Sequence, residues 1–268
     1  GSGRPPVGTA VGGCDQGSRQ WSTDPGGGLA NQHDPDDKTV DYGRAVAFDQ
    51  GDPTGWKVTK AAQLDVSAGS QIFGGLAENP DPTGLKQVRF TVTPVKFRLP
   101  TMLSPATPIT AGVNAKLTTA GGSGFFGTLD RAGDSASYTI TALVAVPGND
   151  PGELNTSALE AAPTTYPDDI KTLYLAPLAD GILGTDALAL EAKILAQAKS
   201  DDPYDIAKAA EDEFHSSDFT YSTDVRDLQC QGLSTAECFA RFKTGFCQYY
   251  AATMAALLRD LAVPARTA

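Results

Sequence analysis

Apolar and polar residues alternate along the first half of the chain, a period that is typical of strands with one buried face. The clearest alternating runs are 89–93 and 137–141. Segments rich in Gly, Pro and Asp, such as 79–82 and 121–124, separate these runs. We therefore expect an antiparallel β-sandwich or a small barrel over residues 39–147. Its recognisable strands are predicted at 40–48, 87–95 and 137–146.

A period of 3.6 residues replaces this alternation in the last third of the chain and predicts helices. The first helix is expected over 187–199, with Thr185 and Asp186 as its N-cap. The second is expected over 204–215 and opens behind Pro203. The side chains predicted to face inward are Leu188, Ala192, Leu195 and Ala198 in the first helix, and Ile206, Ala210 and Phe214 in the second.

Two more helices are predicted toward the end of the chain. The sequence Ser-Thr-Ala-Glu at 234–237 has the form of a capping box, which starts a helix that we expect to reach about Lys243, with Gly245 as its terminating residue. The fourth helix is expected to begin at Phe246 or Cys247. The acidic run 211–213 is interpreted as a solvated helix face rather than as a pair of catalytic carboxylates.

Together these patterns predict an α+β chain, with an N-terminal β-sandwich-like domain before a helical domain. The predicted parts are a Gly- and Asp-rich arm at 1–38, a β-rich domain at 39–147, a connection at 148–184 and the helical domain at 185–268.

The overall charge of the chain disfavours anionic binding partners. The chain of 268 residues carries a net charge of −11, and its sequence pI is about 4.6. This charge repels phosphate backbones and anionic membrane surfaces, so we expect no nucleic-acid partner. No apolar run reaches the ~20 residues that span a bilayer, and the N-terminus lacks the pattern of a signal peptide. The opening Gly-Ser-Gly resembles a cloning remnant, so we expect an excised piece of a longer protein.

Thiols and imidazoles, the side chains that bind zinc most often, are few in this chain. They are Cys14, Cys230, Cys238, Cys247, His33 and His215. No Cys-x-x-Cys pair occurs, so we expect no metal site and no cofactor. Cys230 and Cys238 are close in sequence, and two interpretations stay open for them. They form a local disulfide if the compartment is oxidising, or they are two partly buried thiols.

The stretch 243–251, Lys-Thr-Gly-Phe-Cys-Gln-Tyr-Tyr-Ala, carries the most chemical information. Cys247 opens the fourth predicted helix, and a glycine lies just before it. A helix N-terminus with a cationic partner can lower a thiol pKa from about 8.5 to roughly 3.5–7.5. This is how a thiol nucleophile is commonly presented. Periodicity alone supports a second interpretation, because Cys247 shares a helical stripe with Tyr250, Met254 and Leu258 and would then be a buried core residue.

The order of elements from 187 to 266 resembles the transglutaminase-like superfamily. The most specific part is 245–251, followed by Leu-Leu-Arg at 257–259 and Val-Pro-Ala-Arg at 263–266. The chain is similar above all to bacterial membrane-anchored transglutaminase-like proteins. In these a β-rich extracytoplasmic segment precedes a papain-like catalytic core.

The resemblance implies a reaction of Cys247 with a protein or peptide substrate. The sulfur would attack the amide carbon of a glutamine side chain or of a peptide, and an amine or water would resolve the thioester. The Cys247 N–H is the implied oxyanion donor. Tyr221 matches a family aromatic without an assigned role, and Arg259 and Arg266 match positions expected to be structural. The implied location is extracytoplasmic, with membrane anchors outside this chain.

The chain also departs from the family pattern. The family's His and Asp follow the Pro-Ala-Arg segment, whereas this sequence stops at Ala268, and His215 precedes the cysteine. We therefore expect an enzyme in the full-length protein and an inactive fragment here. Missing strands would expose part of the apolar face of the Cys247 helix, leading to low stability, self-association or closure by another segment. The alternative is a non-catalytic extracellular binding or structural module with a degenerate core.

Overall fold

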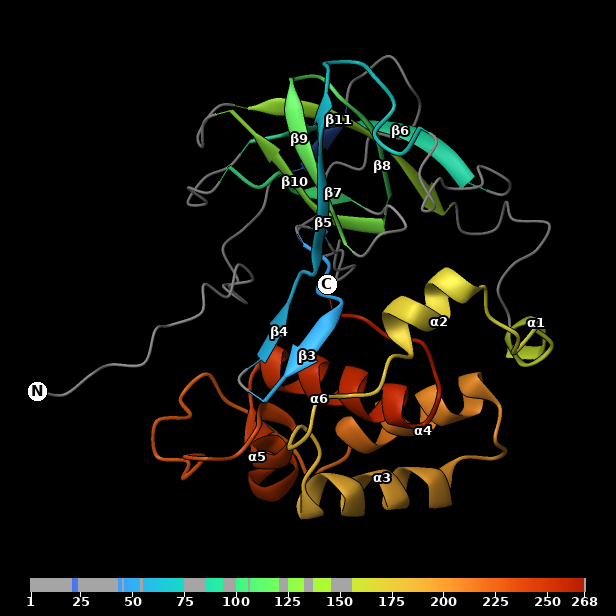
Figure 1. Cartoon of the computed structure of the whole chain (residues 1–268), viewed down its shortest axis with the longest axis vertical. Helices are drawn as coiled ribbons and strands as arrows, with labels where there is room; N and C mark the ends of the chain where they lie inside the picture. The colour runs from blue at the N-terminus through green and yellow to red at the C-terminus, as the bar shows by residue number, and fades with distance from the viewer. Residues whose placement is uncertain are drawn as a thin grey trace, which may run out of the picture.

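The computed structural model describes residues 21–23, 43–44, 46–53, 55–74, 85–93, 100–105, 107–120, 125–132, 137–145 and 156–267. Strands dominate the first part of the chain and helices the last (Figure 1). Figure 1 shows the β-rich part at the top of the molecule and the helices below it. The predicted α+β class is confirmed.

Two antiparallel sheets form most of the β-rich part. Their strand orders are β1-β6-β11-β8 and β10-β9-β5. The strands of the first sheet are β1 (Trp21–Thr23), β6 (Leu85–Val92), β11 (Tyr138–Ala145) and β8 (Thr107–Ala111), and those of the second are β10 (Phe125–Arg131), β9 (Ala115–Ala120) and β5 (Lys60–Val66). The strands predicted at 87–95 and 137–146 correspond to β6 and β11, which pair along their whole length.

The strand predicted at 40–48 is only partly described, and there it is broken. β2 (Gly43–Arg44) pairs with β7 (Ser104–Pro105), and Val46 and Phe48 form isolated bridges. The bridge from Phe48 reaches Thr267, so this segment contacts the C-terminal end of the described chain.

One hydrophobic cluster contains buried residues of both large sheets. Val92 of β6 and Ile140 of β11 come from the first sheet, and Leu117 of β9 and Leu129 of β10 come from the second. All four are at most 4% exposed. The two sheets therefore bury side chains in a common core.

A hairpin from the β-rich part packs on the helices. It consists of β3 (Gln50–Asp52) and β4 (Gly55–Lys57) and lies beside α6 (Cys247–Asp260) (Figure 1). Trp56 of this hairpin packs in one cluster with Ile182, Ala236 and Ala256. The sequence predicted that part of the apolar face of this helix would be exposed, or that another segment would close the gap. The helix's large aliphatic side chains are buried, and the hairpin closes one side of it.

The connection at 148–184 contains two helices, α1 (Thr156–Glu160) and α2 (Asp168–Tyr174). Residues of α2 pack on the β-rich part, because Tyr174 and its neighbours Ile170 and Leu173 cluster with Ala120 and Val58. This segment therefore contributes packing between the strands and the helices.

The helix predicted at 187–199 is α3 (Thr185–Gln197), but its buried face differs from the prediction. Leu188 and Leu195 are 47% and 40% exposed, whereas Ala187, Leu190 and Ile194 are buried. Both stripes are apolar, so periodicity could not choose between them. The stripe that packs on α5 and α4 is the buried one.

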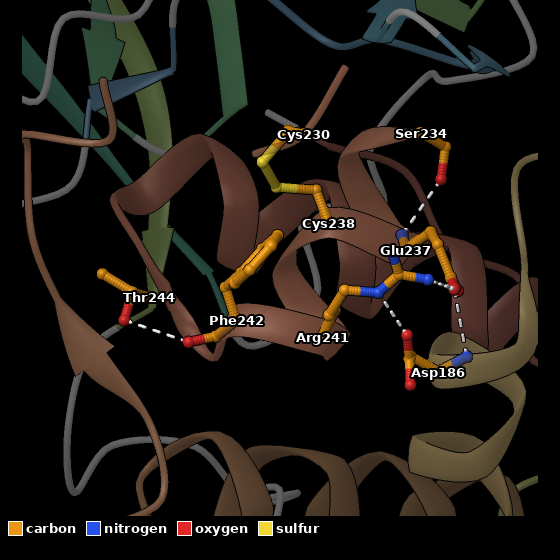
Figure 2. Close-up of a disulfide and its surroundings, with 8 residues drawn as sticks. All are labelled: Asp186, Cys230, Ser234, Glu237, Cys238, Arg241, Phe242 and Thr244. Atoms are coloured by element: carbon orange, nitrogen blue, oxygen red, sulfur yellow. Dashed lines mark hydrogen bonds and ion pairs between the residues drawn. A yellow bond between two sulfur atoms is a disulfide. The ribbon is translucent and has the colours of Figure 1, made fainter. Parts of the chain in front are cut away.

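The predicted cap of α3 is also wrong, because the cap comes from another helix. The N-cap residue is Gly184, without a side-chain bond. The Glu237 carboxylate instead accepts a hydrogen bond from the Asp186 N–H at 3.1 Å (Figure 2). It also accepts one from the Ala187 N–H at 2.9 Å. Arg241 pairs with both Glu237 and Asp186. A buried carboxylate thus stabilises the positive end of α3.

The helix predicted behind Pro203 is α4 (Pro203–Phe214), with Ile206, Ala210 and Phe214 buried as expected. The interpretation of 211–213 as a solvated face is wrong for Glu213, which is 3% exposed. Lys193 donates to Glu213 at 2.7 Å, which offsets the desolvation of its carboxylate.

The capping box at 234–237 forms only half of its predicted bonds. The Ser234 hydroxyl accepts from the Glu237 N–H at 3.0 Å, so Ser234 caps α5 (Thr235–Phe242). The Glu237 side chain is used by α3 instead. α5 ends at Lys243, as predicted, but the terminating residue in the left-handed conformation is Lys243 itself, with φ 49°, and not Gly245. Gly245 belongs to β13 (Thr244–Gly245), which pairs in parallel with β12 (Thr220–Tyr221).

Candidate active site

Cys247 is the first residue of α6, and a short parallel ladder holds the backbone just before it. Tyr221 lies opposite Gly245 in this ladder, and the Ser222 N–H donates to the Gly245 carbonyl at 2.8 Å. Phe246 is extended and serves as the N-cap. The chain therefore turns from strand to helix at the residue that carries the sulfur. The sequence predicted the helix start here, but not the short strand before it.

Gly245 permits a close contact under the first turn of α6. A Cβ at this position would lie 2.7 Å from the Cβ of Tyr249, 2.8 Å from its Cγ and 3.1 Å from Cδ2 of Phe239. The two distances to Tyr249 are too short for real carbon contacts. Any side chain at position 245 would therefore displace Tyr249, two residues after the cysteine.

The electrostatic setting of Cys247 is that of a helix N-terminus. The aligned peptide dipoles place about half a positive charge there, and the first N–H groups have no acceptor within the helix. The first turn of α6 contains no acidic side chain that would offset this charge. Such a helix end favours a thiolate and a developing oxyanion.

The reactivity of Cys247 depends on the oxidation state of its sulfur. Cys247 is half-buried and is disulfide-bonded in this structure. A disulfide sulfur is not a nucleophile, because attack requires the thiolate. Any role of Cys247 in acyl transfer therefore belongs to the reduced protein.

Aromatic rings gather near the start of α6. Tyr250, one turn after Cys247, contacts the rings of Phe239 at 4.5 Å and Phe214 at 6.0 Å between centroids. Tyr221 stacks on Tyr250, with centroids 6.2 Å apart and an interplanar angle of 29°. The rings of Phe239 and Phe214 belong to the core, whereas Tyr221 is 57% exposed.

The structure places the other family-matched residues away from Cys247. Arg259 lies near the opposite end of α6 and donates from Nε to the Ala265 carbonyl at 2.6 Å. Arg266 donates to the Tyr174 hydroxyl at 2.9 Å. Both contacts are structural. His215 caps the C-terminus of α4 and is exposed, and its imidazole forms no hydrogen bond among the described residues.

The predicted disulfide between Cys230 and Cys238 is present (Figure 2). Their Cα atoms are 5.3 Å apart, within the usual range for a disulfide. The bond ties the loop that follows β12 to the buried side of α5, where Cys238 is 1% exposed. A disulfide of this kind is compatible with an extracytoplasmic location.

No pattern in the sequence predicted that Glu191, on α3, would have a shifted pKa. Burial, followed by the charge of Asp260 and a hydrogen bond with it, raises the pKa of Glu191 on α3 to about 7. Asp260 is the last residue of α6, so the pair lies at the opposite end of the helix from Cys247. The two residues are far apart in sequence, and only the packing of α3 near the end of α6 brings them together.

Neither a metal-binding cluster nor a bilayer-spanning helix is found in the part of the chain that the structure describes. No group of three or more His, Cys, Asp or Glu side chains is arranged to hold a metal ion among these residues. None of the described helices is long and apolar enough to span a bilayer.

Comparison with known proteins finds a match for the C-terminal part of the chain. A family model described as transglutaminase-like superfamily matches residues 190–268, which begin within α3 and include α4, α5 and α6. Members of this family are usually cysteine enzymes that perform acyl transfer or hydrolysis. No curated protein and no solved structure matches the chain.

Proposed function

We propose that residues 190–268 provide the nucleophile of a cysteine-dependent acyltransferase or hydrolase that acts on protein or peptide substrates. The observation that supports this most strongly is the position of Cys247. It is the first residue of a helix, behind a ladder that fixes residues 244–245, inside the segment that matches a family of cysteine enzymes.

The proposed reaction begins with the Cys247 thiolate. The sulfur attacks the carbonyl carbon of a glutamine side chain or of a peptide bond, and a C–S bond forms while the carbonyl oxygen becomes an oxyanion. N–H groups at the start of α6 are the proposed donors to that oxygen. The C–N bond then breaks, and the nitrogen leaves with a proton as ammonia or an amine. Water or a second amine attacks the thioester and releases the thiolate.

The proposal assigns no role to His215, which is exposed at the end of α4. A papain-like mechanism also needs a group that moves the thiol proton and protonates the leaving nitrogen. The nucleophilic step is the part of the reaction that the described residues support, so the test addresses that step.

The test measures the reactivity of Cys247 in the reduced, folded protein. The chain is reduced and treated with iodoacetamide at several pH values, and mass spectrometry reports the labelling rate of each cysteine. We expect Cys247 to react several-fold faster than glutathione near neutral pH, because the helix start stabilises its thiolate. A Cys247→Ser chain, which should lack this fast phase, is the matched control. Reaction of Cys247 no faster than glutathione would contradict the proposal.

One observation favours a second function. Because Cys247 is disulfide-bonded in the structure, its sulfur can also serve as a structural link in an extracellular binding or structural module with a degenerate core. This alternative predicts a disulfide that resists mild reductants and a slow, buried thiol once it is reduced. The labelling experiment therefore separates the two functions.

We further propose that the β-rich part, 39–147, is a sandwich-like domain that precedes the helical half of a papain-like core in a bacterial extracytoplasmic protein. The two antiparallel sheets and their common core support the sandwich, and the Cys230–Cys238 disulfide supports the compartment. The proposed membrane anchors lie outside residues 1–268. Fractionation of cells that express the whole protein tests this, and recovery of the protein only in the cytoplasm would contradict it.

A further inference from the structure

The ring of Tyr221 is the most exposed of the large hydrophobic side chains in the described part of the chain. It is 57% exposed, compared with 47% for Leu188 and 39–40% for Leu64 and Leu195. An exposed aromatic ring is common at recognition surfaces, because tyrosine offers a large contact area at a small loss of side-chain entropy. Whether the exposure of Tyr221 has a functional role depends on where the residue lies in the fold.

Tyr221 is fixed close to the nucleophile by backbone hydrogen bonds. In the ladder between β12 and β13 it lies opposite Gly245, two residues before Cys247. Neighbouring strands lie about 4.8 Å apart, and the Ser222 N–H locks the register through the Gly245 carbonyl at 2.8 Å. The main chain of Tyr221 therefore cannot move away from the start of α6 without breaking this ladder.

The ring of Tyr221 rests on a second ring that shares a helix face with the sulfur. Tyr250 follows Cys247 by three residues, and residues at this spacing lie on the same side of a helix with Cβ atoms about 5–6 Å apart. Tyr221 stacks on Tyr250 at 6.2 Å. Cys247, Tyr250 and Tyr221 thus follow one another across the same surface.

The base of this stack is rigid. The Tyr250 ring contacts Phe239 at 4.5 Å, Phe214 at 6.0 Å and Phe219 at 6.3 Å, and all three phenylalanines are at most 9% exposed. Burial raises the pKa of Tyr250, so this phenol is neutral at physiological pH. Tyr250 covers one side of the Tyr221 ring and holds the other side toward solvent, as an uncharged and preorganised surface.

We propose that Tyr221 determines substrate specificity by stacking on an aromatic side chain that the protein substrate carries next to its acyl-donor group. This inference rests on the proposed function of Cys247 and names the class of substrate for it. Packing on Tyr250 accounts for only one side of the ring, because Tyr221 is 57% exposed. A substrate ring placed on this surface would bring the adjacent acyl group over the start of α6, where the sulfur lies.

The experiment compares two alkylating reagents on the reduced, folded chain. Iodoacetamide reports the thiol alone, and N-benzyliodoacetamide adds an aromatic ring that can reach Tyr221. The readout is the ratio of the two Cys247 labelling rates, measured by mass spectrometry of the cysteine peptide. The iodoacetamide rate corrects for any change in the thiol itself.

We expect the wild-type ratio to exceed that of glutathione and to fall about two- to tenfold in Tyr221→Ala, in line with the usual strength of an aromatic pair. Tyr221→Phe should keep the ratio, because it keeps the ring. Leu188→Ala, which removes another exposed apolar side chain on the outer face of α3, should also leave it unchanged.

Two failures can be told apart. A slow iodoacetamide reaction at Cys247 would contradict the proposed nucleophile. A fast iodoacetamide reaction with the same benzyl preference in wild type and Tyr221→Ala would leave the nucleophile in place and overturn the role of Tyr221. If the benzyl preference fell in Tyr221→Phe as much as in Tyr221→Ala, stacking by the ring would also be overturned.

Discussion

The two ends of α6 are built in opposite ways. At the N-terminal end, Cys247 is half-buried behind a two-residue ladder, and the exposed ring of Tyr221 lies nearby. At the C-terminal end, Arg259 is 7% exposed and is held by a carbonyl and two aromatic rings. The same helix is therefore anchored at one end and accessible at the other.

The difference indicates where the fold obtains its stability. The guanidinium of Arg259 lies 4.8 Å from the ring of Trp56 on the hairpin and 5.6 Å from that of Tyr174 on α2. Tertiary contacts from three separate segments thus meet at the end of α6 that carries no candidate chemistry. In the proposed function the sulfur has to meet a macromolecular substrate, which needs an accessible surface, and the anchored end allows the other end to provide one.

Arg259→Ala should have the largest effect on the free energy of unfolding. It removes the hydrogen bond to Ala265 and both ring contacts, and it leaves a partly buried carbonyl without that donor. We expect a loss of about 3 kcal/mol, measured by urea unfolding with far-ultraviolet circular dichroism. Burial lowers the pKa of Arg259 to about 10, so the side chain stays charged at neutral pH.

A matched control for this prediction is Arg226→Ala. Arg226 pairs with Asp224 at 2.7 Å, but its side chain is 87% exposed. Its removal should change the free energy of unfolding by less than about 1 kcal/mol. Equal effects of the two arginine variants would refute the view that the C-terminal end of α6 is the anchor.

Gly245→Ala tests the accessible end. The new Cβ would lie 2.7–2.8 Å from Tyr249, so the first turn of α6 has to shift. We expect a loss of about 2 kcal/mol, as for other overpacked sites. The iodoacetamide rate of the reduced Cys247 should change as well, whereas Arg259→Ala should leave that rate unchanged below its unfolding transition. Gly232→Ala is the control for backbone strain. Its new Cβ would meet nothing within 4 Å, but position 232 has a φ of 79°, so this variant adds strain without a packing clash.

An unaltered labelling rate in Gly245→Ala would show that the geometry before Cys247 does not control the sulfur. The accessible end of α6 would then be no more than an unpacked terminus, and the comparison between the two ends would lose its functional meaning.

Local signals in the sequence predicted the elements that depend on local chemistry. α4 begins at Pro203, where the Asp202 side chain accepts from the Tyr204 N–H, and its three predicted core residues are buried. Cys247 was expected at the start of a helix and is found there. Helix caps, proline and a single clear apolar stripe act within a few residues, so a single sequence contains them.

Contacts between distant segments could not be predicted in this way. α3 has two apolar stripes, and its partner helices decide which one is buried. Its N-terminus is capped by Glu237, about 50 residues later, which the local pattern assigned to Ser234. Glu213 is acidic and yet buried, because Lys193 from α3 reaches it. The Trp56 hairpin covers α6 from the other part of the chain. In each case the deciding group is far away in sequence.

Glu191→Gln should have the smallest effect and should depend on pH. In the folded protein, burial and Asp260 raise the pKa of Glu191 from 4.5 to about 7. The unfolded chain loses this proton near 4.5, whereas the folded chain keeps it to about 7. The contribution of the protonated side chain is therefore complete below pH 4.5 and is lost as the pH rises toward 7.

Glutamine resembles the protonated side chain at every pH, so the variant should not show this loss. We expect Glu191→Gln to match wild type near pH 4.5 and to be more stable by about 1 kcal/mol near pH 8, since partial solvation weakens the effect. Urea midpoints at several pH values measure this difference. Glu211→Gln, on the exposed face of α4, should give a curve parallel to that of wild type. If Glu191→Gln is also parallel to wild type, the carboxyl pair at the end of α6 does not share a proton, and the anchored end depends on Arg259 and its rings alone.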